Sequence, residues 1–161
     1  MTRTAARELA VQLCFGLSAD SAPDEAALDR FFDGEHYESL AAEDECFRQK
    51  PDEKQLDYIR EVTQGVAARQ AELDAYIQKY AVGWKPERIS RTALTVMRVA
   101  MFEILYVGDV PAGAAINEAV ERAKGYDEPE TVSFINGVLG AFVRGETPEG
   151  REPADAPAPE A

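Results

Sequence analysis

Apolar side chains recur along the first part of this chain at the spacing of a helix. In residues 4–18 they fall at i, i+3, i+4, i+7, i+8 and i+11, which places them in one continuous stripe on a helix surface. The stripe consists of Ala6, Leu9, Ala10, Leu13, Cys14 and Leu17. Thr4 is the expected N-cap, because its hydroxyl can accept a free backbone N–H. The pattern predicts an amphipathic helix packed against a core.

Five later segments also carry helical signals: residues 24–32, 53–82, 90–107, 112–125 and 129–143. The register of the longest segment loosens around Gly65, so it is either two helices or one kinked helix. Residues 90–107 are apolar on more than one face, which is typical of a central, buried helix. A helix that is apolar all round must be covered by its neighbours, so the segments together predict a helical bundle.

No segment shows the sustained alternation with β-branched residues that marks a strand, so the predicted fold class is all-α. Residues 33–52 interrupt the helical pattern, and we expect an acidic loop or a partly helical insertion there. After Arg144 the sequence is rich in Pro, Glu, Gly and Ala without a period, which predicts a disordered acidic tail over 145–161. The helical domain is therefore expected to cover residues 1–144.

Charge is distributed unevenly over the 161 residues, whose formal net charge is −13. Residues 20–50 carry ten acids and three bases, and residues 144–161 carry five acids and two bases. The only positive stretch is residues 1–19, where Arg3 and Arg7 outnumber Glu8. This acidity argues against broad, nonspecific RNA binding but leaves room for a local basic patch.

The sequence offers little for catalysis. It contains one histidine, His36, within the acidic insertion, and it lacks a phosphate-binding glycine loop, a nucleophile elbow and a metalloprotease histidine pair. Cys14 and Cys46 are far apart and suggest neither a disulfide nor a metal site. We therefore expect a binding protein with no catalytic residue, metal or cofactor. Without a membrane-spanning run or an export signal, the expected location is the cytoplasm.

Arg3 and Arg7 are four residues apart and so share one face of the first predicted helix. Thr4 lies beside them and can donate a hydrogen bond to a phosphate oxygen. Arginine near a helix N-terminus meets phosphate with charge, paired donors and free backbone N–H groups. The simpler interpretation, favoured on spacing alone, is two solvated arginines on an amphipathic helix.

Four blocks of sequence stand out. Residues 110–123 read VPAGAAINEAVERA, residues 134–139 read FINGVL, residues 97–104 read MRVAMFEI, and residues 3–10 read RTAARELA. In this order and at this spacing they resemble the NusB family of bacterial transcription antitermination factors. Together with Trp84 and Lys85, these blocks cover about residues 3–18 and 53–143. The resemblance implies two small helical subdomains within one all-α fold.

The resemblance also implies partners. These are the boxA element of ribosomal RNA leader transcripts, bound as single-stranded RNA, and the small-subunit ribosomal protein NusE. The complex acts on RNA polymerase during antitermination. The residues implied in RNA binding are Arg3, Thr4, Arg7, Glu130, Ser133 and Phe134. Glu103 and Tyr106 match the region that faces the ribosomal protein, and an exposed apolar face leaves a homodimer open.

Two departures from the family pattern keep an alternative open. The family's first helix usually carries a denser basic cluster, and the position occupied by Ser133 is often Lys or Arg. The alternative is a protein-interaction module of the same fold with little or no RNA binding. Descent from the NusB-like domain of some ribosomal RNA methyltransferases is the least favoured, because the predicted tail leaves no room for a methyl-donor domain.

Overall fold

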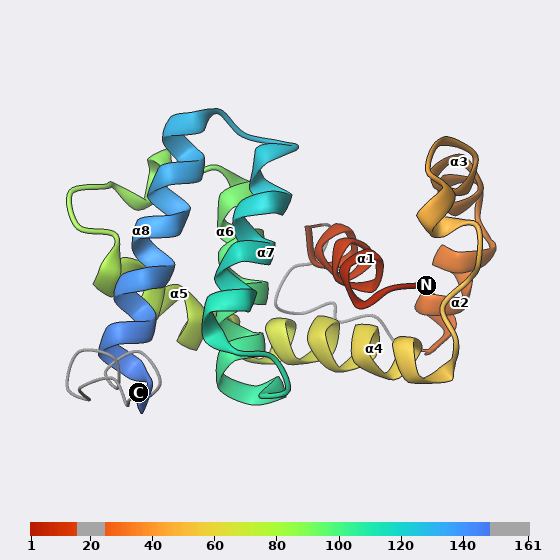
Figure 1. The fold of residues 1–161 in the computed structure, drawn as a ribbon, viewed down its shortest axis with the longest axis horizontal. Helices are drawn as coiled ribbons and strands as arrows, with labels where there is room; N and C mark the ends of the chain where they lie inside the picture. Colours follow the sequence, from red (N-terminus) through yellow and green to blue (C-terminus); the bar gives the residue numbers. More distant parts are fainter. Residues whose placement is uncertain (16–24, 149–161) are drawn as a thin grey trace, which may run out of the picture. The chain divides into compact units, whose positions relative to one another are not determined.

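The computed structural model describes residues 1–15 and 25–148, and that part of the chain contains helices and no β-strand. The predicted all-α class is confirmed. The chain divides into two compact units, Met1–Arg69 and Gln70–Ala161, which agrees with two small helical subdomains (Figure 1). No helix among the described residues is long and apolar enough to cross a membrane.

In the first unit, helix α1 (Arg3–Phe15) packs against helix α4 (Glu53–Ala68). Leu9, Ile59 and Val62 are fully buried, as expected for amphipathic helices that share a core. The predicted cap was wrong by two residues, because the hydroxyl of Thr2 accepts the N–H of Ala5 at 3.0 Å. Thr4 consequently lies inside the first turn. Residues 16–18 of the predicted helix fall outside the described residues.

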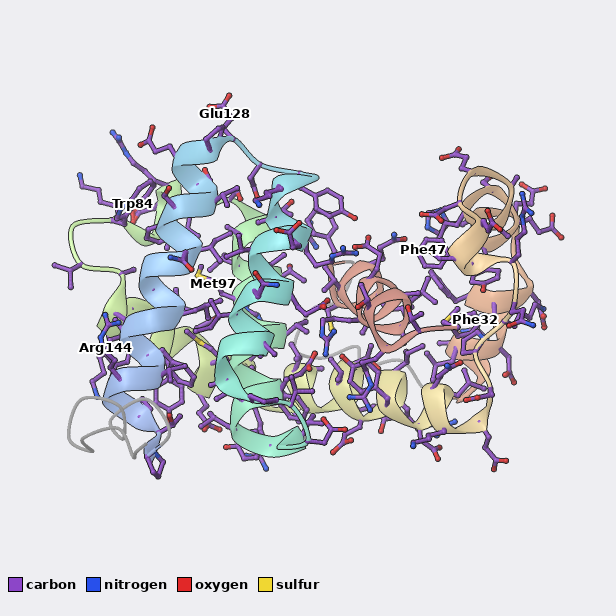
Figure 2. All side chains as sticks on the ribbon, viewed as in Figure 1. Phe32, Phe47, Trp84, Met97, Glu128 and Arg144 are labelled. Atoms are coloured by element: carbon purple, nitrogen blue, oxygen red, sulfur yellow. The ribbon has the colours of Figure 1, made fainter. Side chains whose placement is uncertain are left out.

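The predicted insertion at 33–52 is largely helical in the structure. Helix α2 (Glu25–Asp33) is followed by helix α3 (Glu35–Glu43) and a 3-10 turn at Glu45–Phe47. Tyr37 joins them, because its ring meets the edge of Phe32 at 5.2 Å and its hydroxyl donates to the carbonyl of Phe47 at 2.7 Å (Figure 2). Burial raises the pKa of the Tyr37 hydroxyl, with a smaller contribution from Cys46. A small aromatic core thus orders a segment whose acids remain exposed.

The long helical pattern at 53–82 forms two helices, α4 and α5 (Gln70–Tyr80). The break falls at Arg69, whose backbone leaves the helical region at φ −113° and ψ 19°. Its N–H still donates to the carbonyl of Gly65 at 3.0 Å, which ends α4 with a regular last turn. The break coincides with the boundary between the two units.

In the second unit, helix α6 (Arg91–Phe102) contacts α5, α7 (Ala112–Lys124) and α8 (Pro129–Glu146). The hydroxyl of Ser90 caps α6 by accepting the N–H of Ala93 at 3.0 Å. Eight of its residues are buried: Ala93, Thr95, Val96, Met97, Val99, Ala100, Met101 and Phe102. Met97, labelled in Figure 2, is fully buried. The prediction of a central, covered helix is confirmed.

The end of α6 widens into a π-helical turn at Glu103–Val107. Gly108 closes this turn by donating its N–H to the carbonyl of Glu103 at 3.1 Å. Its φ of 71° lies in the left-handed region, where a side chain would be strained. The glycine therefore permits the sharp exit from the buried helix toward α7.

Helix α8 continues to Glu146, two residues past the predicted end of the helical domain, and residues 149–161 lie outside the described part. The carboxylate of Glu146 accepts the ammonium of Lys79 at 2.7 Å and the hydroxyl of Tyr80 at 2.5 Å. Gly145 has no side chain, and a Cβ there would collide with the Tyr80 hydroxyl. These contacts fix the last turn of α8 on α5.

The contacts of Glu146 with Lys79 and Tyr80 should weaken in alkaline solution. The hydrogen bond to Glu146 raises the pKa of Tyr80, and the same carboxylate raises the pKa of Lys79. A group whose pKa is raised in the folded state stabilises the fold at pH values below its ordinary pKa, about 10. This stabilisation disappears as the pH rises through the raised pKa. We expect the Tm of the wild type to fall more steeply above about pH 10 than that of Tyr80→Phe. Tyr126→Phe, at an exposed tyrosine, is the control. Parallel curves of Tm against pH for the wild type and Tyr80→Phe would contradict this stabilising role of Tyr80.

Candidate functional site

Tyr58 on α4 supports both arginines of the first helix. The guanidinium carbon of Arg3 lies 4.1 Å from the centre of the Tyr58 ring, and that of Arg7 lies 6.0 Å from it. The structure therefore brings together two of the predicted residues, as their four-residue spacing implied. Arg7 and Tyr58 are each only 5% exposed, whereas Arg3 is half-buried and Thr4 is exposed. An incoming ligand can thus reach Arg3 and Thr4 more easily than Arg7.

Arg3 lines a pocket of about 220 Å³ together with Lys54, Gln55 and Tyr58. Two of the four lining side chains are cations and none is a carboxylate. Lys54 is exposed, and its ammonium forms no hydrogen bond or ion pair with the described residues. The first turn of α1 carries no acid. Of the acids close to Lys54 in the sequence, Asp52 caps α4 and Asp57 is paired with Arg60 at 2.7 Å. The pocket is therefore suited to an anion.

Gln55 explains why the starts of α1 and α4 lie together. Its backbone N–H donates to the carboxylate of Asp52 at 2.9 Å, and its side-chain oxygen accepts the N–H of Asp52 at 3.0 Å. This capping box fixes the first turn of α4. The side-chain nitrogen of Gln55 also donates to the carbonyl of Met1. One residue thus caps one helix and holds the segment that leads into the other.

The sequence analysis missed Lys54 and Tyr58. Lys54 follows Asp52 and Glu53, so it appears as one charge among several in a solvated helix start. Tyr58 reads as an ordinary core residue on the apolar face of α4. Only the packing of α1 on α4 shows that these two residues, about 50 positions after Arg3, share its pocket.

Three other predicted residues, Glu130, Ser133 and Phe134, lie on α8 in the second unit. Phe134 is half-buried and packs on Trp84, with ring centres 4.2 Å apart and planes inclined by 37° (Figure 2). Glu130 and Ser133 are both exposed. The structure thus pairs the one aromatic residue predicted to bind RNA with the only tryptophan of the chain.

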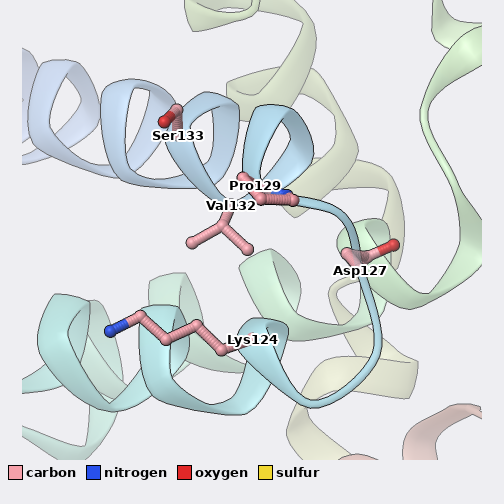
Figure 3. A pocket seen from close by; sticks show the side chains of 5 residues that line it. All are labelled: Lys124, Asp127, Pro129, Val132 and Ser133. Carbon is pink, nitrogen blue, oxygen red and sulfur yellow. The ribbon is translucent and has the colours of Figure 1, made fainter.

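Ser133 also borders a pocket of about 370 Å³ between the end of α7 and the start of α8, whose other lining residues are Lys124, Asp127, Pro129 and Val132 (Figure 3). Val132 projects from α8 toward α7 in this view. Lys124 is paired with Glu121 at 2.8 Å, which lowers the pKa of that carboxyl. This pocket carries charges of both signs, in contrast to the pocket beside Arg3.

The two residues predicted to face a protein partner differ in accessibility. Glu103 begins the π-helical turn and is only 2% exposed. Tyr106 is 39% exposed, its ring lies 5.3 Å from that of Phe102, and its hydroxyl donates to Glu72 at 2.7 Å. An incoming protein can touch Tyr106 directly, whereas Glu103 is positioned to support the turn from within.

The described residues offer no constellation for metal binding. Among residues 1–15 and 25–148, no group of three or more His, Cys, Asp and Glu side chains could hold a metal ion. His36 is exposed, and its Nε2 lies 3.1 Å from the side-chain oxygen of Gln12. Cys14 is buried and Cys46 is exposed, and neither forms a disulfide.

Comparison with known proteins gives a consistent result. The sequence profile of the NusB family matches residues 4–144. A transcription antitermination protein NusB from Carboxydothermus hydrogenoformans is 42% identical over 140 residues, covering 87% of this chain and 91% of that protein. One from Nitratidesulfovibrio vulgaris is 37% identical over 145 residues, covering 89% and 88%. The solved structure of T. maritima NusB superimposes with a TM-score of 0.68 at 25% identity, covering 94% of this chain and 98% of that one.

Proposed function

Because the chain belongs to the NusB family, we propose that it is a transcription antitermination factor that acts by binding and not by catalysis. Its RNA target is a boxA-type, single-stranded element of ribosomal RNA transcripts. Its protein partner is the ribosomal protein NusE, with which it joins the antitermination complex on RNA polymerase in the cytoplasm. The observation that carries the RNA assignment is the cationic pocket beside Tyr58, where Arg3 and Lys54 lie without a carboxylate among the lining residues.

Each predicted residue has a role under this proposal. Arg3 and Thr4 contact RNA phosphates, and the buried Arg7 adds positive charge beneath them. The exposed part of Phe134 offers a surface on which an unpaired base can stack. Glu130 and Ser133 then flank that base with polar groups. Tyr106 contacts NusE, and Glu103 holds the turn that presents it.

A second candidate function is a protein-interaction module that binds RNA weakly or not at all. The burial of Arg7 and the net charge of −13 favour it, because they leave few accessible cations for phosphate. Both functions include binding of the protein partner. They differ in whether the chain also binds RNA through Arg3. One experiment therefore separates them.

The experiment mixes the full chain with NusE and boxA RNA at low salt and follows gel mobility. We expect a ternary complex, and we expect Arg3→Glu to weaken RNA binding about tenfold, since it removes one phosphate contact and adds repulsion. Binding of NusE should be unchanged. The matched control is Tyr106→Ala, which should weaken NusE binding and spare RNA contacts.

Three results would count against the proposal or against the role of Arg3. Folded proteins that form no ternary complex at low salt contradict the RNA function. Binary binding of NusE without any RNA supershift supports the interaction module instead. Equal loss of RNA and NusE binding in Arg3→Glu would show that the arginine acts on the fold and not on RNA.

A further inference from the structure

We propose that Lys54 and Arg3 form a two-point clamp for one RNA phosphate, and that Tyr58 is the positioning residue that fixes Arg3. The proposal rests on the RNA-binding function above and extends it to two residues outside the arginine-bearing helix. It also assigns the ligand chemistry, a phosphate group of single-stranded RNA, to the pocket of about 220 Å³.

Arg3 is held in a geometry suited to phosphate. Its guanidinium carbon lies 4.1 Å from the centre of the Tyr58 ring, which is the separation expected for a cation stacked on an aromatic face. Stacking occupies the flat face of a guanidinium, while its N–H donors point outward in the plane. The ring of Tyr58 is 95% buried, so it cannot swing away from the arginine. Tyr58 thus limits the rotamers of Arg3 before any ligand arrives.

Lys54 supplies the second cation. It lies one helical turn before Tyr58 on α4, so the two side chains share a face and line the same pocket as Arg3. Its ammonium has no partner among the described residues. A cation in the first turn of a helix is also disfavoured by the helix dipole. A phosphate between Arg3 and Lys54 would offset this unfavourable placement.

The pocket is assembled without a ligand. Gln55 joins the carbonyl of Met1 to the capping box of α4, so the backbone before Arg3 is tied to the turn that carries Lys54. A preorganised site loses less entropy on binding. The volume is below the range typical of pockets for drug-sized ligands, about 300–1,000 Å³, which fits a phosphate group with its base outside.

The first test measures the affinity of the chain–NusE complex for boxA RNA over a salt series. We expect Lys54→Ala to weaken binding about three- to tenfold and to reduce the log–log salt slope by about 0.7, the value for one phosphate contact on a single strand. The matched control is Lys50→Ala, which removes the same charge from an exposed lysine of the same unit that is paired with Asp33. Equal changes of the log–log salt slope in both variants would mean that Lys54 contributes only to the overall charge of the protein. That result would overturn the clamp.

The second test separates positioning from folding. Tyr58→Phe keeps the aromatic face and should bind RNA like the wild type. Tyr58→Leu should weaken binding about as much as Arg3→Ala, and the double variant Tyr58→Leu/Arg3→Ala should lose no more than either single variant. Additive losses in the double variant would contradict the positioning role. If Tyr58→Leu does not fold, the RNA affinity of Arg3→Ala is measured in the Tyr58→Phe background. A loss as large as in the wild-type background shows that the aromatic face alone is enough to position Arg3.

A third measurement tests phosphate binding at the clamp without using RNA. We expect pyrophosphate, titrated into the free chain at low salt, to shift the backbone amide resonances of Arg3, Lys54 and Gln55. Lys54→Ala should abolish these shifts and Lys50→Ala should retain them. If boxA RNA fails to bind while these shifts appear, the clamp stands and the RNA target is wrong. An absence of shifts at these three residues would reject the clamp itself.

Discussion

Replacing Phe142 with alanine is expected to reduce the free energy of unfolding of the second unit by about 3–5 kcal/mol. Phe142 is fully buried on α8, and its ring meets the edges of Tyr76 at 5.2 Å and Tyr80 at 6.2 Å. Removal of the ring deletes both aromatic contacts and leaves a cavity between α5 and α8. We expect this to be the most damaging of the substitutions considered.

Urea unfolding followed by tryptophan fluorescence measures this loss, because the only tryptophan, Trp84, lies in the second unit. The control is Tyr126→Ala, which removes an aromatic ring that is 51% exposed and should cost less than about 1 kcal/mol. Similar losses in both variants would mean that the interior around Phe142 is not tightly packed.

The elements that the sequence predicts best are those whose signal is local and long. The apolar residues of α6 lie on more than one face, and a covered central helix is the arrangement that buries them. The break at Arg69 is different, because the apolar register only loosens around Gly65, which left two helices and one kinked helix both open. The α2–α3 segment was also difficult to predict, since its core comes from Phe32, Tyr37 and Phe47, too few positions to show a period.

The residues of the candidate site also divide into those with a local signal in the sequence and those without one. The spacing of Arg3 and Arg7 within one helix was sufficient to place both on one face, and both lie over Tyr58. Tyr58 and Lys54 depend on how α1 packs on α4, which no local pattern encodes. The burial of Glu103, at the start of the π-helical turn, likewise follows from the tertiary structure and has no local signal in the sequence.

The chemistry of the site also shows why net charge is a poor guide to function. The acids of α3 and the turn that follows are solvent-exposed on their own small aromatic core. The cationic pocket is built by other elements of the same unit, α1 and α4, with no acid in its lining. A protein with a net charge of −13 can therefore keep a local site for phosphate, provided that salt does not screen it.

The second large effect is expected at the ion pair between α5 and α6. Arg98 donates Nε–H to one oxygen of Asp74 at 2.7 Å and Nη2–H to the other at 3.0 Å, a paired geometry that strengthens both bonds. The side chains are only 14% and 34% exposed. Asp74→Ala would leave the guanidinium half-buried without this partner, and we expect a loss of about 1.5–3 kcal/mol in the second unit.

A double-mutant cycle tests whether the pair itself is responsible. Arg98→Ala and Asp74→Ala should each cost more than half of the double variant, because once one partner is gone the other is an uncompensated charge. Glu121→Ala is the control, since it breaks the exposed pair with Lys124 in the same unit and should leave the stability almost unchanged. If Asp74→Ala costs no more than Glu121→Ala, water already solvates Arg98, and apolar contacts alone hold α5 against α6.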